Sequence, residues 1–288
     1  MDQTITLDLI SKLNLLYSWL SLRTCVVAFS GGVDSATLAK ALVLVNQTQT
    51  MPNSKVRPLA LLAESLTTTK DEITEAKQIA KEIGIELQIL HSNEFKEPCF
   101  VENSPNRCYW CKKIRFKMIN TFITHELLPW WGENIVIIDG SNMDDKNDYR
   151  PGIQAARELG ILSPFTELGI TKSDIRTLAS VWGLSFAQKP SNSCLATRLA
   201  YYLPLREEIL HQIEVAERIL RTIFGSIHLR ARVDTPGIVR IEVPEELIGK
   251  VVIPKVRFKL IKELRKVGFK FVTLDLEGFF SGKNNRIE

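Results

Sequence analysis

The sequence predicts an α/β protein in which a doubly wound parallel sheet is followed by a smaller α+β domain. Short apolar runs alternate with helical patterns through the first two thirds of the chain, as strands and crossover helices do in a parallel sheet. Those runs are almost continuously apolar, which is typical of strands that helices cover on both faces. After about residue 190 the pattern changes, so we expect a second fold unit there.

The elements of the first part follow from the spacing of apolar residues. Residues 5–20 alternate apolar with polar side chains and predict an amphipathic first helix, and the later helical segments carry apolar residues at helical spacing. We expect strands at Thr24–Phe29, Arg57–Ala63, Glu86–Leu90 and Asn134–Asp139, with further helices at Asp34–Asn46, Lys70–Ile83 and Lys112–Leu128.

The last third predicts a different architecture. A helical pattern covers Leu205–Thr222, and the alternating runs "IHLRARV" and "GIVRIEV", joined by "DTPG", predict a half-exposed β-hairpin. A further helix is expected at Lys255–Lys266 and a closing strand in "FKFVTLDL". We place the boundary near residues 190–204, with one domain at 1–195 and the other at 196–288.

Composition limits the class of protein. Of 288 residues, 45% are hydrophobic and 24% are charged, as in ordinary globular proteins. A formal net charge of +4 over this length does not argue for nucleic acid as a partner. No apolar run approaches the roughly 18 residues of a membrane span, and the N-terminus does not resemble a signal peptide. We expect a cytoplasmic protein, without a membrane partner, whose five cysteines are reduced.

The stretch "VVAFSGGVDSATLAKAL" turns from apolar to small and polar at Ser30, between an expected strand and an expected helix. One interpretation is a tight turn with Asp34 or Ser35 as the helix cap. The other is an anion site, because Gly31 and Gly32 let the backbone approach a ligand and helix N-termini attract phosphate. In that case Asp34 suits Mg²⁺ between itself and the phosphate. The loop lacks the lysine of a Walker A motif, so transfer of a γ-phosphate is not implied.

Three motifs resemble, in order, those of the PP-loop ATP pyrophosphatase superfamily: "SGGVDS" at 30–35, "DGSNMDD" at 139–145 and "TKSDIR" at 171–176. The resemblance implies a sheet of the PP-loop ATP pyrophosphatase type. It also implies that the loop holds the pyrophosphate of ATP while a substrate oxygen attacks the α-phosphate, which gives an adenylate. The ATP ligands carried over are Ser30, Gly31, Gly32, Asp34 and Ser35, with Asp34 also on Mg²⁺.

Further stretches resemble the LarE family over nearly the whole chain. They are "NDYRPG" at 147–152, "SCLATR" at 193–198, "LRAR" at 229–232 and the closing "GFKFVTLDLEGFFSG". Members insert sulfur into pyridinium-3,5-biscarboxylic acid mononucleotide, on the way to the nickel-pincer cofactor of lactate racemase. The resemblance therefore implies an ATP-dependent sulfurtransferase with a small-molecule mononucleotide as substrate. It also implies a homo-oligomer, and it names no sulfur donor.

The implied mechanism assigns a role to each matching residue. Adenylation gives the carboxylate a good leaving group, and a sulfur nucleophile at Cys194 can then displace AMP and leave a thiocarboxylate. A nearby cation such as Arg198 would stabilise the reactive thiolate. The substrate-binding residues that the resemblance implies are Arg198, Glu217, Arg230, Arg232 and Glu242.

The residues themselves leave alternatives open. Arg230 and Arg232 lie two apart on an expected strand and share a face, which suits a bidentate grip on phosphate or carboxylate. The other interpretation is a pair of solvated charges on an edge strand. Arg150, beside a Pro-Gly turn, is a further anion-binding candidate. Lys250 stands where the family has an acid, so no acidic role is carried over to it.

Cys108 and Cys111 form a C-x-x-C pair, which by itself is compatible with zinc, a redox pair or chance. Some LarE-like proteins carry a lone cysteine at the Cys194 position, which is sacrificed and becomes dehydroalanine. Here all three positions are cysteine, and the resemblance to cluster-bearing PP-loop thiolation enzymes implies a 4Fe-4S cluster on these thiolates. A structural zinc ion normally has four protein ligands, and the remaining cysteines do not supply a convincing fourth. We expect Cys25 and Cys99 to be buried or incidental.

Three other functions share part of this pattern. A PP-loop tRNA thiolase would need a basic surface or an added RNA-binding module, which the modest net charge does not favour. An ammonia-dependent adenylating synthetase has no use for the cysteine trio. A nucleotide-binding regulator without catalysis would have no reason to retain Asp34 and Cys194.

Overall fold

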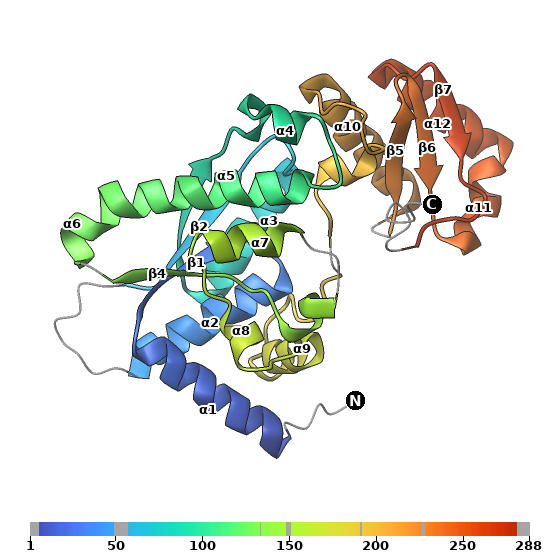
Figure 1. Cartoon of the computed structure of the whole chain (residues 1–288). Coiled ribbons are helices and arrows are strands. Elements are labelled where there is room, and N and C mark those ends of the chain that lie inside the picture. Colours follow the sequence, from blue (N-terminus) through green and yellow to red (C-terminus); the bar gives the residue numbers. More distant parts are fainter. Residues whose placement is uncertain are drawn as a thin grey trace. The chain divides into compact units, whose positions relative to one another are not determined.

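The computed structural model describes residues 6–48, 57–132, 134–147, 151–190, 192–225 and 228–280 (Figure 1). The chain forms two compact units. The N-terminal unit comprises Met1–Ser65, Lys70–Glu94 and Cys108–Asn192, and the C-terminal unit comprises Leu66–Thr69, Phe95–Arg107 and Ser193–Glu288. Two short segments from the first part of the chain thus group with the C-terminal unit, whereas the sequence analysis assigned them to the first domain.

The N-terminal unit contains a parallel sheet with the strand order β3-β2-β1-β4. The strands are β1 (Thr24–Phe29), β2 (Leu59–Glu64), β3 (Glu86–His91) and β4 (Ile135–Ile138). Strand β1 pairs on both sides, with Val26 opposite Leu59 of β2 and Ile137 of β4. The parallel sheet predicted from the apolar runs is confirmed.

Helices cover both faces of this sheet (Figure 1). On one face Val27 and Leu62 belong to an apolar core with α1 (Leu7–Ser21), α2 (Val33–Thr48), α3 (Lys70–Ile83) and α9 (Lys172–Val181). On the other face Val26 and Leu61 belong to a core with α5 (Arg107–Phe122) and α7 (Pro151–Glu158). Successive residues of each strand therefore serve opposite layers, which confirms a doubly wound α/β unit. The short elements η3 (Met143–Asn147) and α8 (Pro164–Glu167) belong to this unit, whereas η1 (Glu94–Lys96) begins in it at Glu94 and continues into the segment Phe95–Arg107 of the C-terminal unit.

The helix predicted at Lys112–Leu128 is interrupted. Helix α5 ends at Phe122, a π-helical turn spans Ile123–Leu127, and α6 covers Leu128–Trp131. Pro129 gives the physical reason, since its ring has no N–H for the carbonyl four residues earlier and clashes with it.

The C-terminal unit contains a three-stranded sheet with the order β5-β6-β7. The strands are β5 (Arg230–Thr235), β6 (Ile238–Glu242) and β7 (Phe271–Leu274), and the helices are α4 (Pro98–Val101), η4 (Leu195–Arg198), α10 (Glu207–Phe224), α11 (Glu245–Val252) and α12 (Pro254–Val267). Strands β5 and β6 pair antiparallel, as the predicted hairpin requires, and β7 joins β6 in parallel. Among the described residues, no helix has both the length and the apolar character needed to cross a bilayer.

Candidate active site

The glycine loop joins the carboxyl end of β1 to the amino end of α2. Gly31 has a φ of +69°, which glycine adopts without strain, and a Cβ at this position would lie 2.8 Å from the Cβ of Ala76 in α3. The first amides of α2 have no acceptor within the helix and favour an anion. The loop also lies at the sheet edge where open α/β folds bind ligands.

Two serine hydroxyls brace the loop. Ser35 Oγ accepts a hydrogen bond from the N–H of Ser30 and donates one to the carbonyl of Gly32, each at 3.2 Å. The hydroxyls of Ser30 and Ser35 are 3.1 Å apart. Helix α2 begins at Val33, so Asp34 and Ser35 lie inside its first turn and neither is the N-cap residue. The expectation that one of them caps the helix is therefore wrong, and the phosphate-binding role of the loop stays a prediction.

Asp34 forms an ion pair with Lys172 at the start of α9. The Lys172 Nζ lies 2.5 and 2.6 Å from the two carboxylate oxygens. Burial raises the pKa of Asp34 above its ordinary value; the hydrogen bond from Lys172 opposes this shift, and the nearby charge of Asp145 adds to it. A buried carboxylate with a second acid nearby is stabilised by a cation, and here the ammonium of Lys172 supplies it.

The second motif, "DGSNMDD", docks against the amino end of α2. A Cβ on Gly140 would lie 2.6 Å from the backbone nitrogen of Ser35, so the two main chains are in direct contact. Asp139 accepts hydrogen bonds from the N–H of Ser141 (3.1 Å), from its hydroxyl (2.9 Å) and from the hydroxyl of Ser163 (2.7 Å). These bonds fix the motif beside the glycine loop.

Sequence reasoning missed two lysines at this site. The Lys112 Nζ is 3.4 Å from Asp139 Oδ2, and the Lys189 Nζ donates to the carbonyl oxygen of Gly31 at 3.0 Å. Lys112 directly follows the C-x-x-C pair and Lys189 opens "KPSNSC", so each stood beside a motif already singled out. Their partners lie 27 and 158 residues away in the chain, which no local pattern reveals.

The C-x-x-C cysteines lie near the start of α5. Cys108 is exposed and Cys111 is half-buried, and a spacing of three residues puts them on one helix face. The Cys111 Sγ contacts the carboxylate of Glu94 at 3.9 Å. Glu94 is fully buried and pairs with Arg115, so a buried ion pair fixes the surroundings of Cys111.

Cys194 directly precedes η4 in the C-terminal unit, whereas Cys108 and Cys111 belong to the N-terminal unit. Within the described ranges, no group of three or more His, Cys, Asp and Glu side chains forms a candidate metal site. The cluster on three cysteines therefore stays a prediction. Cys25 is buried as expected, and burial raises the pKa of its thiol to about 12; Cys99 is half-buried.

Four of the predicted substrate residues form two buried ion pairs in the C-terminal unit. The Arg198 Nε lies 2.8 Å from Glu217 Oε1, and the Arg232 Nε lies 2.6 Å from Glu242 Oε1. None of these side chains is more than 7% exposed. Removing one partner of such a pair leaves an uncompensated buried charge, so the pairs organise this unit.

Arg198 also holds the turn that carries Cys194. Its guanidinium donates to the carbonyl oxygens of Ser193 (2.7 Å) and Cys194 (3.2 Å). Its ion-pair partner Glu217 also accepts the N–H of Ala231 in β5 (3.3 Å). The Arg198 side chain thus binds the backbone carbonyl of Cys194 and fixes the turn that carries this cysteine.

Arg230 differs from Arg232 in its surroundings. Its guanidinium lies over the ring of Phe279, 4.9 Å from the centroid, and donates to the carbonyl of Leu229 at 2.7 Å. Burial, followed by repulsion from Arg198 and Arg232, lowers the pKa of Arg230 to about 10. A cation in such surroundings gains from a bound anion, which makes Arg230 the clearest anion-binding candidate of the C-terminal unit.

Lys250 and Arg150 were also singled out in the sequence. Lys250 is exposed on α11, with its ammonium 5.9 Å from the centre of the Phe224 ring. Arg150 lies outside the described residues.

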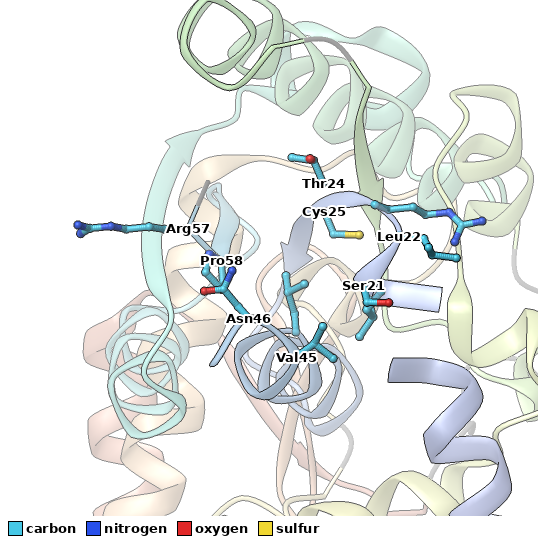
Figure 2. Close-up of a pocket in the computed structure, with 11 residues that line it drawn as sticks. Ser21, Leu22, Thr24, Cys25, Val45, Asn46, Arg57 and Pro58 are labelled. Carbon is cyan, nitrogen blue, oxygen red and sulfur yellow. The ribbon is translucent and has the colours of Figure 1, made fainter. Parts of the chain in front are cut away.

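Two pockets flank the sheet of the N-terminal unit. Figure 2 shows a pocket of about 240 Å³ at the amino ends of β1 and β2, with Thr24, Cys25 and Arg57 in its lining. Because the glycine loop follows the carboxyl end of β1, this pocket lies at the opposite edge of the sheet. A pocket of about 460 Å³ has Asn142 and Asp145 of the second motif in its wall and therefore adjoins the candidate site.

Comparison with known proteins gives matches to a family and to solved structures that cover part of the chain. The family described as tRNA methyl transferase HUP domain matches residues 23–128, which is less than half of the chain. The structure of NMN synthetase from Francisella tularensis aligns with a TM-score of 0.48 at 15% identity, over 66% of this chain and 76% of that one.

Three curated proteins match almost the whole chain. An uncharacterized protein of Synechocystis sp. is 37% identical over 92% of this chain and 93% of its own length. Pyridinium-3,5-bisthiocarboxylic acid mononucleotide synthase of Lactiplantibacillus plantarum is 31% identical over 95% of this chain and 93% of its own length. An uncharacterized protein of Methanocaldococcus jannaschii is 29% identical, over 88% and 90% respectively.

Replacing Arg198 by methionine should lower the free energy of unfolding by about 3 kcal/mol, because Glu217 would lose its buried partner and keep only Arg221, 3.8 Å away and more exposed. Chemical denaturation measures this change. The double variant R198M/E217M should recover much of the loss, whereas K266M, at the exposed Lys266–Glu263 pair, should show no measurable change. A stability of R198M equal to that of the wild type would contradict the organising role of the pair.

Proposed function

This chain belongs to the LarE family of PP-loop ATP pyrophosphatases, and we propose that it adenylates a carboxylate of pyridinium-3,5-biscarboxylic acid mononucleotide and converts it to a thiocarboxylate. The observation that carries the proposal is the 31% identity, over 95% of the chain, to a synthase of the corresponding bisthiocarboxylic acid. The braced glycine loop supports the ATP half of the reaction, and the arginines of the C-terminal unit support an anionic substrate.

Activation of the carboxylate is the first step of the proposed reaction. A carboxylate oxygen attacks the α-phosphorus of ATP, the bond from that phosphorus to the bridging oxygen breaks, and pyrophosphate leaves with the electron pair. The backbone of Gly31 and Gly32 and the first amides of α2 would hold the pyrophosphate. Because Ser30 and Ser35 already brace the loop, these donors are in place before the nucleotide binds.

Asp34 is the residue that would hold Mg²⁺. A carboxylate is a preferred ligand of this ion, and because burial raises the pKa of Asp34, a cation beside it would stabilise the ionised form. Magnesium would neutralise charge on the triphosphate. Lys172 donates hydrogen bonds to both carboxylate oxygens of Asp34 in this structure. With Mg²⁺ bound to Asp34, the Lys172 side chain would instead donate to a phosphate oxygen of ATP.

The mononucleotide offers a phosphate and two carboxylates to the C-terminal unit. Arg230, with its lowered pKa, is the residue proposed to bind one of these anions directly. The two buried ion pairs beside it complete the proposed substrate site, which comprises Arg198, Glu217, Arg230, Arg232 and Glu242.

Cys108, Cys111 and Cys194 are proposed to hold a 4Fe-4S cluster, which would supply the sulfide that replaces AMP on the activated carboxyl carbon; Cys194 would take part in catalysis as a cluster ligand and keep its own sulfur. Support comes from the donor set, three thiols of which two share a face of α5. A cluster on three protein thiolates has one iron without a protein ligand, which can take up an added sulfide. The proposed cytoplasmic location and homo-oligomeric state rest on the resemblance to LarE proteins.

The wild-type protein should convert ATP to AMP and pyrophosphate without forming ADP, because the glycine loop has no Walker lysine and suits a pyrophosphate. Asp34→Ala should abolish pyrophosphate release without loss of the fold, as thermal melting can verify. Asp8→Ala is the matched control, because Asp8 also pairs with a lysine but is 71% exposed on α1. Formation of ADP and orthophosphate would contradict the adenylation mechanism.

Arg230→Ala should weaken mononucleotide binding by about tenfold or more, because a hydrogen bond to a charged group contributes about 1.5–3 kcal/mol. ATP affinity should stay unchanged. Titration calorimetry with each ligand separates the two effects, and Arg257→Ala, on the exposed surface of α12, is the control. Impaired ATP binding with normal mononucleotide binding would reverse the assignment.

Anaerobic protein should contain iron and sulfide, and Cys108→Ala or Cys111→Ala should remove both together with sulfur transfer. The reason is that a cluster needs all three thiolates, whereas sacrifice of Cys194 needs neither of the other two. Metal analysis and mass spectrometry of the intact protein after turnover decide between the routes. A product lighter by one H₂S at Cys194, in protein reconstituted with iron and sulfide, would overturn the cluster proposal.

A further inference from the structure

Lys189 places a full positive charge on the glycine loop. Its Nζ donates to the carbonyl oxygen of Gly31 at 3.0 Å and forms an ion pair with Glu75 at 2.8 Å. The side chain of Lys189 is 20% exposed and that of Glu75 is 45% exposed. An ammonium has three N–H donors, and the described part of the chain supplies acceptors for two of them.

The main chain around Lys189 is fixed by Arg176 of α9. This guanidinium donates to the carbonyl oxygens of Ala187 (2.7 Å) and Lys189 (2.9 Å). The N–H of Lys189 donates to the carbonyl of Phe186 at 2.9 Å, and both Phe186 and Ala187 are buried. The Lys189 side chain therefore starts from a rigid turn, so a ligand would need to order only the side chain itself.

The other groups at the loop supply few full positive charges to a pyrophosphate. Lys172 is paired with Asp34 and would supply one ammonium once Mg²⁺ takes its place. The amides of the loop and of α2 carry only partial charges. A leaving pyrophosphate gains negative charge as its bond to the α-phosphorus breaks, and a cation held beside the loop stabilises that state more than it stabilises bound ATP.

We propose that Lys189 binds the pyrophosphate group of ATP and stabilises it as the leaving group, an inference that rests on the proposed adenylation. The carboxylate oxygen of the substrate forms its bond to the α-phosphorus while the bond to the bridging oxygen breaks, and the electron pair goes to pyrophosphate. Lys189 donates hydrogen bonds to that group and keeps its proton. It retains the contact with Gly31 and exchanges the half-exposed Glu75 for a phosphate oxygen.

Calorimetric titration of the full-length protein with inorganic pyrophosphate and Mg²⁺ tests this role. Lys189→Met should weaken binding by about ten- to hundredfold, because a hydrogen bond between charged groups is lost. Lys189→Arg should recover part of the affinity, since it keeps the charge. Glu75→Gln should bind pyrophosphate at least as tightly as the wild type, because it removes a competing carboxylate.

Lys12→Met is the matched control. Lys12 is 23% exposed, close to the exposure of Lys189, but it pairs with Asp8 and Asp174 on α1 and α9. Its replacement should leave pyrophosphate affinity unchanged. In steady-state assays, Lys189→Met should lower kcat for pyrophosphate release by a larger factor than it raises KM for ATP.

Equal pyrophosphate affinity in Lys189→Met and in the wild type would overturn the proposal. So would a loss of affinity that comes with a lower melting temperature and that Lys189→Arg fails to restore, since it would show a purely structural role. If the wild type releases no pyrophosphate from ATP, the adenylation proposal fails, and the calorimetry still decides whether Lys189 is a pyrophosphate ligand.

Discussion

The amino end of α2 is held by two close backbone approaches, and the candidate ATP site depends on both. On one side Gly31 lies against Ala76 of α3, and on the other Gly140 lies against the main chain of Ser35. Neither position has room for a side chain. The first amides of α2 and the carboxylate of Asp34 are therefore fixed relative to each other, which is the preorganisation that an anion site with a metal-binding carboxylate needs.

Buried ion pairs set the electrostatic surroundings of the other cations. An unpaired buried ion is strongly destabilising, and in the C-terminal unit Glu217 and Glu242 each compensate a buried arginine. The same cluster leaves Arg230 in surroundings that lower its pKa, so positive potential is concentrated there. In the N-terminal unit the partner of Lys189 is a half-exposed glutamate, a pair that solvent screens and a ligand can replace.

The spacing of apolar residues predicts those helices and strands that depend only on their own segment of the sequence. The helix at Lys70–Ile83 and the strand at Thr24–Phe29 have the predicted bounds, because the apolar spacing that predicts each element starts and stops within its own segment. The π-helical turn before Pro129 and the grouping of Phe95–Arg107 with the C-terminal unit were missed, since both depend on contacts that spacing does not encode. The same limit applies to the site. Motifs located Asp34 and the segment of Lys172, but the ion pair between them joins residues 138 apart.

The central claim is that this protein activates a carboxylate by adenylation on the glycine loop. The most direct measurement follows oxygen-18 from a mononucleotide substrate labelled in its carboxylates, under turnover with unlabelled ATP. The account predicts that AMP gains one labelled oxygen for each thiocarboxylate formed and that pyrophosphate gains none. Unlabelled AMP, with the label in orthophosphate or pyrophosphate, would contradict it.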